Sequence, residues 1–95
     1  MNKSGKLALK EIADHYGLRT QSLKLIEEMA ELTQSLSKLL IDPCDGSIVE
    51  NVEEEIADVN VMLKQLIYLC GIGDEVNEIM HQKIARQLER IKNES

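Results

Sequence analysis

Two short acidic clusters hold the residues of this chain whose types and spacing could do chemistry. Each cluster offers a pair of carboxylates three residues apart, Glu28 with Glu31 and Glu55 with Asp58. Residues three apart lie on one face of a helix. Two such helices packed side by side would bring the carboxylates together, and these would repel one another strongly unless a cation lay among them. The spacing therefore predicts a metal site made of Glu28, Glu31, Glu55 and Asp58.

The apolar residues around the clusters recur with the period of a helix. On a wheel at about 100° per residue, Glu28 and Glu31 fall on the flank of their apolar stripe, whereas Glu55 falls inside its own. The neighbours of Glu55 on that face are Val52, Val59 and Met62. An ionised carboxylate in such surroundings needs a partner, or it takes up a proton. A salt bridge from Lys83 or Arg90 is the alternative to a metal.

The type of ligand indicates which metal to expect. Carboxylate oxygens without Cys or His suit Mg²⁺, with Mn²⁺ as the second choice. A rival di-iron site would use Glu78 and His81, because a Glu-x-x-His helix is a component of carboxylate-bridged di-iron bundles. Such a site needs two of these motifs, and the other histidine, His15, has Glu11 four residues before it rather than three. We therefore expect His81 to be a surface residue.

The composition predicts one all-α domain over residues 1–95. The hydrophobic fraction is 43%, but there is no Trp or Phe and there are only two Tyr, so the core must be aliphatic. No segment alternates for long enough with the period of two that marks a strand. Because so small an aliphatic core often gains from oligomerisation, we expect a homo-oligomer rather than a monomer.

Apolar periodicity and turn residues together predict a short N-terminal helix and three long helices. Gly17 is the expected end of the short helix. The long helices are expected from about Thr20 to Leu40, from Ser47 to a stop at Gly71–Gly73, and from Asp74 onward. Ser47 and Asp74 are the expected N-caps of their helices, and Glu50 completes a capping box with Ser47.

Charge, cysteines and hydropathy limit the setting. The formal net charge is −6, although residues 1–24 hold five basic side chains against two acidic ones. This overall charge disfavours nucleic acid as a partner. Cys44 and Cys70 lack CxxC spacing, so we interpret them as reduced thiols. No apolar run approaches the ~18 residues of a membrane span, and the first residues lack a signal-peptide apolar region. We expect a cytoplasmic protein with no membrane partner.

The two acidic clusters together resemble a family signature. They are similar to the EExxE…ExxD pattern of MazG-like all-α nucleoside triphosphate pyrophosphohydrolases: Glu27-Glu28-x-x-Glu31, then 23 residues, then Glu55-x-x-Asp58. The resemblance extends over roughly residues 15–90, with Gln21 before the first cluster and Lys83-x-x-Arg86 on the last helix. It implies a MazG-like helical bundle that assembles as a homodimer or a dimer of dimers.

The resemblance also implies an activity and residue roles. The family hydrolyses NTPs or dNTPs between the α- and β-phosphates, giving the monophosphate and pyrophosphate. Lys83 and Arg86 would contact phosphates, Gln21 would contact the substrate, and Arg90 is a further candidate of our own. The implied Mg²⁺ ligands are Glu28, Glu31, Glu55 and Asp58.

Such a substrate suits an acidic site only when cations are bound there. A triphosphate brings about four negative charges, so it can bind only with metal ions bridging it to the carboxylates. A further carboxylate could then act as general base. Glu27 and Glu31 are the nearest candidates for that role.

Two other functions compete with hydrolysis. Residues 7–26 also fit a helix-turn-helix, with Arg19, Thr20, Gln21 and Ser22 on the recognition helix. That helix would continue for about 20 residues into the first acidic cluster, however, and the cluster would repel DNA phosphates. The other competitor is a MazG-fold protein that has lost activity and serves as a binding module.

Overall fold

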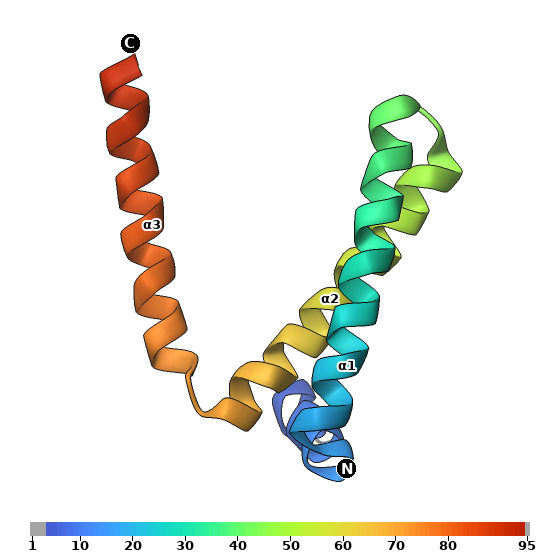
Figure 1. The fold of residues 1–95 in the computed structure, drawn as a ribbon, viewed down its shortest axis with the longest axis vertical. Coiled ribbons are helices and arrows are strands. Elements are labelled where there is room, and N and C mark those ends of the chain that lie inside the picture. The colour runs from blue at the N-terminus through green and yellow to red at the C-terminus, as the bar shows by residue number, and fades with distance from the viewer. Residues whose placement is uncertain (1–3, 95) are drawn as a thin grey trace.

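Three helices make up the described part of the chain, residues 4–94 of a computed structural model (Figure 1). They are α1 (Gly5–Ile41), α2 (Gly46–Cys70) and α3 (Gly73–Glu94). No strand occurs between residues 4 and 94, so the all-α expectation is confirmed. Residues 1–3 and 95 of the expected domain lie outside the described residues. Within residues 4–94 we find no helix with an apolar stretch that could span a lipid bilayer.

Helix α1 is two helical segments joined at a sharp break. Its N-terminus is capped by Ser4, whose Oγ accepts a hydrogen bond from the Leu7 N–H at 3.2 Å. Gly17 interrupts the helix with φ 86° and ψ 169°, a conformation that is essentially reserved for glycine. The expected short N-terminal helix therefore ends at Gly17 as predicted. The second segment of α1 follows Gly17 directly, without a loop. The sequence instead predicts that this helix begins near Thr20.

The start of α2 differs from the expectation by two residues. Asp45, not Ser47, is the N-cap: its Oδ1 accepts hydrogen bonds from the Ser47 N–H at 2.9 Å and the Ile48 N–H at 3.4 Å. The Ser47 hydroxyl donates to the same oxygen at 2.7 Å, and this bond is the main cause of a lowered pKa of Asp45. The capping box of Ser47 and Glu50 was wrong because an aspartate two residues earlier already satisfies the free N–H groups.

The turn between α2 and α3 is a Schellman motif. Gly71 has left-handed dihedral angles (φ 64°, ψ 36°). The Gly71 N–H donates to the Tyr68 carbonyl at 3.1 Å, and the Ile72 N–H donates to the Ile67 carbonyl at 3.2 Å, which is the double bond pattern of that motif. The expected stop is confirmed. Asp74 is not the cap of α3, since the helix already begins at Gly73 and Asp74 lies in its first turn.

The core lies between α1 and α2, which run back alongside each other as a hairpin (Figure 1). Its apolar cluster is small: Leu25, Val59 and Met62 are buried, with Leu32 and Leu66 partly buried against them. One buried and one partly buried pair of polar side chains add two links between the helices. Gln21 donates to Gln65 Oε1 at 2.7 Å, and the Ser35 hydroxyl donates to Asn51 Oδ1 at 2.7 Å.

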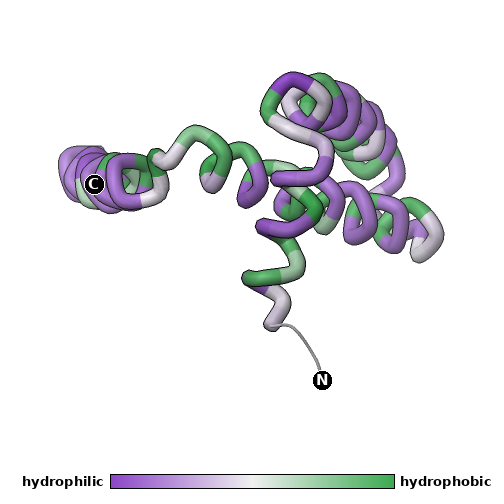
Figure 2. The backbone as a smooth tube through the Cα atoms, turned by 90° about the horizontal axis from the view of Figure 1, so that it is seen from below, coloured by the Kyte–Doolittle hydropathy of each residue, from purple (hydrophilic) through white to green (hydrophobic). Residues whose placement is uncertain are grey.

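Helix α3 stands away from this hairpin (Figures 1 and 2). None of its residues is buried, and its apolar side chains are open to solvent: Ile79, Met80, Ile84, Leu88 and Ile91. The chain has a surface of 7457 Å², whereas a compact monomer of 10.7 kDa would have about 5,500 Å². Its radius of gyration is 16.7 Å, against about 12 Å for a compact domain. One chain alone therefore leaves about 2,000 Å² more surface exposed than a globular monomer does.

The break in α1 generates a stability prediction. Gly17→Ala should lower the free energy of unfolding by about 1–3 kcal/mol, because a Cβ disfavours this backbone conformation, although open space surrounds the Gly17 Cα. Gly46→Ala is the matched control: it also lies in open space, at an ordinary helical position, and should be neutral or slightly stabilising. Chemical denaturation measures both. Equal stability of the two variants would contradict the assigned break.

Candidate metal centre

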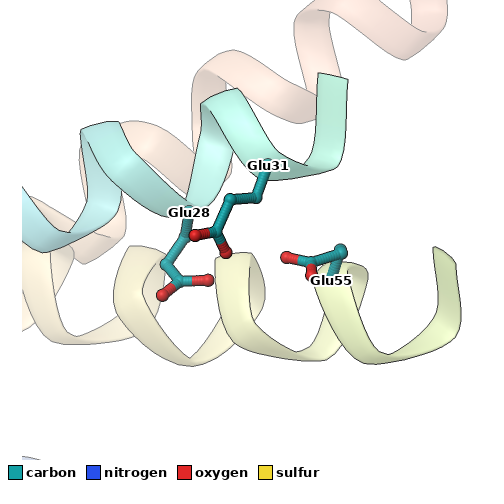
Figure 3. Close-up of side chains that lie close together, drawn as sticks. All are labelled: Glu28, Glu31 and Glu55. Carbon is teal, nitrogen blue, oxygen red and sulfur yellow. The ribbon is translucent and has the colours of Figure 1, made fainter. Parts of the chain in front are cut away.

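Three carboxylates face one another across the α1–α2 interface (Figure 3). Glu28 and Glu31 come from α1 and Glu55 comes from α2. One oxygen of each lies within 4.8 Å of the others. Glu28 is buried, Glu55 is half-buried and Glu31 is exposed at the open side of the cluster. The predicted approach of the two acidic clusters is thus present for three of the four expected ligands.

The apolar packing of the hairpin places these carboxylates. On α1, Leu25 lies in the core one turn before Glu28, and Leu32 packs against the core one turn after it. On α2, buried Val52 and Val59 lie on either side of Glu55 along the same face. Because apolar neighbours hold both stripes in the interface, the packing of the helices keeps Glu28 and Glu55 close together. The expectation that Glu55 lies within an apolar stripe is confirmed.

Two oxygens of the cluster lack any partner in the protein. Glu28 Oε2 and Glu55 Oε2 are both buried without a hydrogen bond. A buried polar atom left unpaired costs about 1–3 kcal/mol, and more when it is charged. The other oxygen of Glu28 has a partner, since Lys24 Nζ lies 3.1 Å from Oε1. No salt bridge from Lys83 or Arg90 reaches Glu55 among residues 4–94, so that alternative does not apply within one chain.

The negative charges of the cluster raise the pKa values of two exposed side chains, Glu31 and Lys24. The negative charge of Glu28 is the main cause that raises the pKa of Glu31; desolvation and the charge of Glu55 add to it. On the other side, the hydrogen bond to Glu28 raises the pKa of Lys24, with the charge of Glu27 in support. Lys24 therefore offsets part of the charge at Glu28, and an excess of negative charge remains among the three carboxylates.

This donor set fits a hard divalent cation. All three groups offer carboxylate oxygens, the ligands that Mg²⁺, Ca²⁺ and Mn²⁺ prefer, and two oxygens of the group are buried without a hydrogen bond. Glu28 and Glu55 would hold the ion from the buried side, and Glu31 from the solvent side.

Asp58 and Glu27 lie outside the group. Asp58 is exposed on α2 and does not join the three oxygens. Glu27 is exposed and lies at the edge of the Lys24 ion pair, with its Oε2 4.0 Å from Nζ. Within one chain the expected set of four ligands is therefore reduced to three.

The expected phosphate contacts are not brought to the cluster by their own chain. Lys83, Arg86 and Arg90 are exposed on α3, which stands apart from the hairpin (Figure 1). Gln21, the expected substrate contact, is only 6% exposed and is bonded to Gln65. Gln21 therefore links α1 to α2 about two helical turns before Glu28.

The structure does not assemble the rival di-iron site. His81 is exposed on α3, as expected, together with Glu78. His15 is exposed on α1, where its ring meets the edge of Tyr16 at 4.7 Å between centroids. Among residues 4–94 the only group with metal-ligand geometry is the glutamate cluster.

Two residues of the site were missed at the level of sequence. Lys24 precedes Glu28 by four residues, the spacing of an intrahelical ion pair, and this signal was present in the chain. Gln65 lies at a core position of α2 and is 1% exposed. Nothing in the spacing of Gln65 distinguishes a buried amide that meets another helix from a surface glutamine.

No family model matches the sequence, and comparisons with curated proteins and with solved structures likewise find no match. The likeness to MazG-like pyrophosphohydrolases stays a prediction made from the acidic motifs. Function must therefore be inferred from the residues and the geometry of the site.

The raised pKa of Glu31 predicts how stability depends on pH and metal. In metal-free protein the proton on Glu31 is held more tightly in the folded state than in the unfolded one, so the stabilisation is present below the ordinary value of 4.5 and is lost as pH rises through the raised value. Adding Mg²⁺ should raise Tm most at pH values above the raised pKa of Glu31, because its carboxylate is ionised there. Glu31→Gln should remove much of both effects, whereas Glu27→Gln, outside the oxygen group, should retain them.

Thermal unfolding followed by circular dichroism, with Mg²⁺ or with a chelator across this pH range, measures these effects. A Glu31→Gln variant whose Tm responds to Mg²⁺ as strongly as the wild type does would contradict a role for Glu31 in cation binding.

Proposed function

We propose that the chain hydrolyses nucleoside triphosphates to the monophosphate and pyrophosphate, with Mg²⁺, or Mn²⁺ in its place. The observation that carries the proposal is the meeting of Glu28, Glu31 and Glu55 across two helices with two buried oxygens unpaired. Structural ion pairing alone does not account for those two oxygens, whereas a bound cation does. The EExxE…ExxD resemblance supplies the reaction class.

The charge of the cluster supports a polyphosphate substrate of this kind. Triphosphate oxygens and carboxylate oxygens repel each other, so direct binding is unfavourable without a cation between them. When bound, Mg²⁺ neutralises charge on the phosphates and lowers the pKa of an attacking water. The exposed side of the cluster, at Glu31, is where a large anion has access.

The carboxylates would divide their tasks according to burial. Glu28 and Glu55 are held by the core packing and serve as fixed ligands. Glu31 is the exposed member of the group, so an attacking water can reach its carboxylate, as a general base requires. Glu31 is therefore our first choice for general base. Glu27, which lies beside Lys24, is the second. Asp58, which does not join the three oxygens within one chain, would become a ligand only if its side chain turned towards a bound ion.

The basic side chains that would bind the phosphates would come from a second chain. Lys83, Arg86 and Arg90 lie on a helix that does not approach the cluster of its own chain, whereas the α3 of another copy can do so. The exposed surface of the single chain supports a homodimer or a dimer of dimers, because about 2,000 Å² per chain is in the range that obligate interfaces bury. A cytoplasmic location, where nucleoside triphosphates occur, suits this activity.

The burial of Gln21 weighs against the helix-turn-helix alternative. A recognition helix needs its polar side chains at the surface, but Gln21 is buried against Gln65. The helix also continues unbroken from Leu18 into Glu27 and Glu28, whose charges oppose DNA.

Pyrophosphate release from a panel of NTPs and dNTPs tests the proposal. Wild type should release pyrophosphate with Mg²⁺ and lose activity in chelator, and Glu55→Gln should lower the rate by about a hundredfold or more. Glu53→Gln is the matched control, since Glu53 is an exposed residue of the same cluster and should keep full activity. A wild type that is inactive across the panel, or a fully active Glu55→Gln variant, would refute the proposed hydrolysis. The alternative of a binding module without activity would then remain.

A further inference from the structure

A hollow with an apolar floor and a basic rim lies where the hairpin meets the start of α3. Its volume is about 800 Å³. Leu9, Val61 and Ile67 are among the floor residues, and the charged residues of the lining are all lysines: Lys6, Lys10 and Lys64. Lys10 lies over the Tyr68 ring, with Nζ 5.4 Å from its centroid. We call this feature the basic groove.

The first half of α3 has the complementary character. It carries three acidic residues and no lysine or arginine before Lys83: Asp74, Glu75 and Glu78. Val76, Ile79 and Met80 recur at helical spacing beside them, and the last two are about half exposed. An apolar stripe with an acidic flank is what an apolar groove with a lysine rim would bind.

The α3 of the same chain contributes only its first residue to this groove. Gly71 and Gly73 form part of the lining, so α3 begins at the groove and then leaves it. The Schellman bonds of Gly71 and Ile72 end α2 at the groove, and α3 then runs away from the hairpin (Figure 1). A helix that filled the rest of the groove would therefore come from another copy of the chain.

The direction of a helix bound there follows from charge. The first half of α2 is acidic, with Glu50, Glu53, Glu54, Glu55 and Asp58, whereas its second half carries Lys64. Helix α3 has the same order, acidic first and then Lys83, Arg86, Arg90 and Lys92. Only an antiparallel arrangement of α3 on α2 pairs opposite charges along both helices.

We propose that the basic groove binds the acidic first half of α3 from a second copy of this chain, with the two copies exchanging their α3 helices. Each chain offers one groove and one α3, so two copies satisfy each other in a closed twofold dimer. The exposed surface beyond that of a compact monomer, about 2,000 Å² per chain, matches what an obligate dimer buries.

The exchange also carries basic residues to the carboxylates, and this consequence alone rests on the proposed function. A helix rises about 1.5 Å per residue, so Glu55 lies about 14 Å along α2 from Lys64. On an antiparallel α3 with Ile79 level with Lys64, Arg86 and Arg90 lie about 10 and 16 Å further along. The two arginines of one copy would thus bracket the level of Glu55 in the other.

Charge reversal followed by sedimentation tests the interface without any activity assay. Wild type should be dimeric, and Lys6→Glu/Lys64→Glu should raise the dimer dissociation constant by about tenfold or more. Glu75→Lys/Glu78→Lys should do the same, and the four changes combined should restore association. Lys38→Glu, at the far end of α1, is the control and should remain dimeric. A monomeric wild type, or a dimer that no reversal weakens, would overturn the proposal.

Cross-linking decides which copy supplies the helix. In a Cys44→Ser/Cys70→Ser background, chains with Lys64→Cys mixed with chains carrying Ile79→Cys should form a disulfide-linked dimer. Leu88→Cys in place of Ile79→Cys should not, because it lies about 14 Å further along α3. With Lys64→Cys and Ile79→Cys in one chain, a disulfide-linked monomer would show closure onto the chain's own groove and overturn the exchange. Failure of hydrolysis would leave these results unaffected.

Discussion

Two carboxylate oxygens, Glu28 Oε2 and Glu55 Oε2, are buried between α1 and α2 without a partner, and the rest of the structure has to accommodate them. The apolar residues that close the hairpin also hold these glutamates in place, so packing and charge repulsion act at the same interface. Lys24 compensates only one oxygen of Glu28. A cation between the helices would convert this repulsion into attraction, which links folding of the hairpin to occupancy of the site.

The hairpin is a weak unit in isolation. Its apolar cluster consists of Leu25, Val59 and Met62 with two partly buried leucines, while α3 buries no residue. Such a core offers little to offset the repulsion in the acidic site. Metal binding and association with a second copy would each supply part of the missing stability. Under the proposed function, both would also complete one site, because its carboxylates and its basic side chains would then come from different chains.

Most of the fold followed from apolar periodicity and glycines. Gly17 and Gly71 marked real breaks because both adopt positive φ, and Glu55 was placed correctly because its neighbours form a stripe. Helix caps were less predictable, since Asp45 and Ser47 both suit an N-cap and only the loop geometry selects one. The register of α1 against α2, which unites Glu31 with Glu55 and leaves Asp58 outside, depends on packing between residues distant in the chain. The departure of α3 could not be read from its periodicity, which shows an apolar face but not what covers it.

Anomalous diffraction from crystals grown with Mn²⁺, which replaces Mg²⁺ in oxygen sites and scatters strongly, would locate a cation bound to the three glutamates. We expect an anomalous peak between α1 and α2, bonded to oxygens of Glu28, Glu31 and Glu55. A hairpin with no peak there at saturating Mn²⁺, or one in which a lysine or arginine pairs with Glu55 instead, would contradict this expectation.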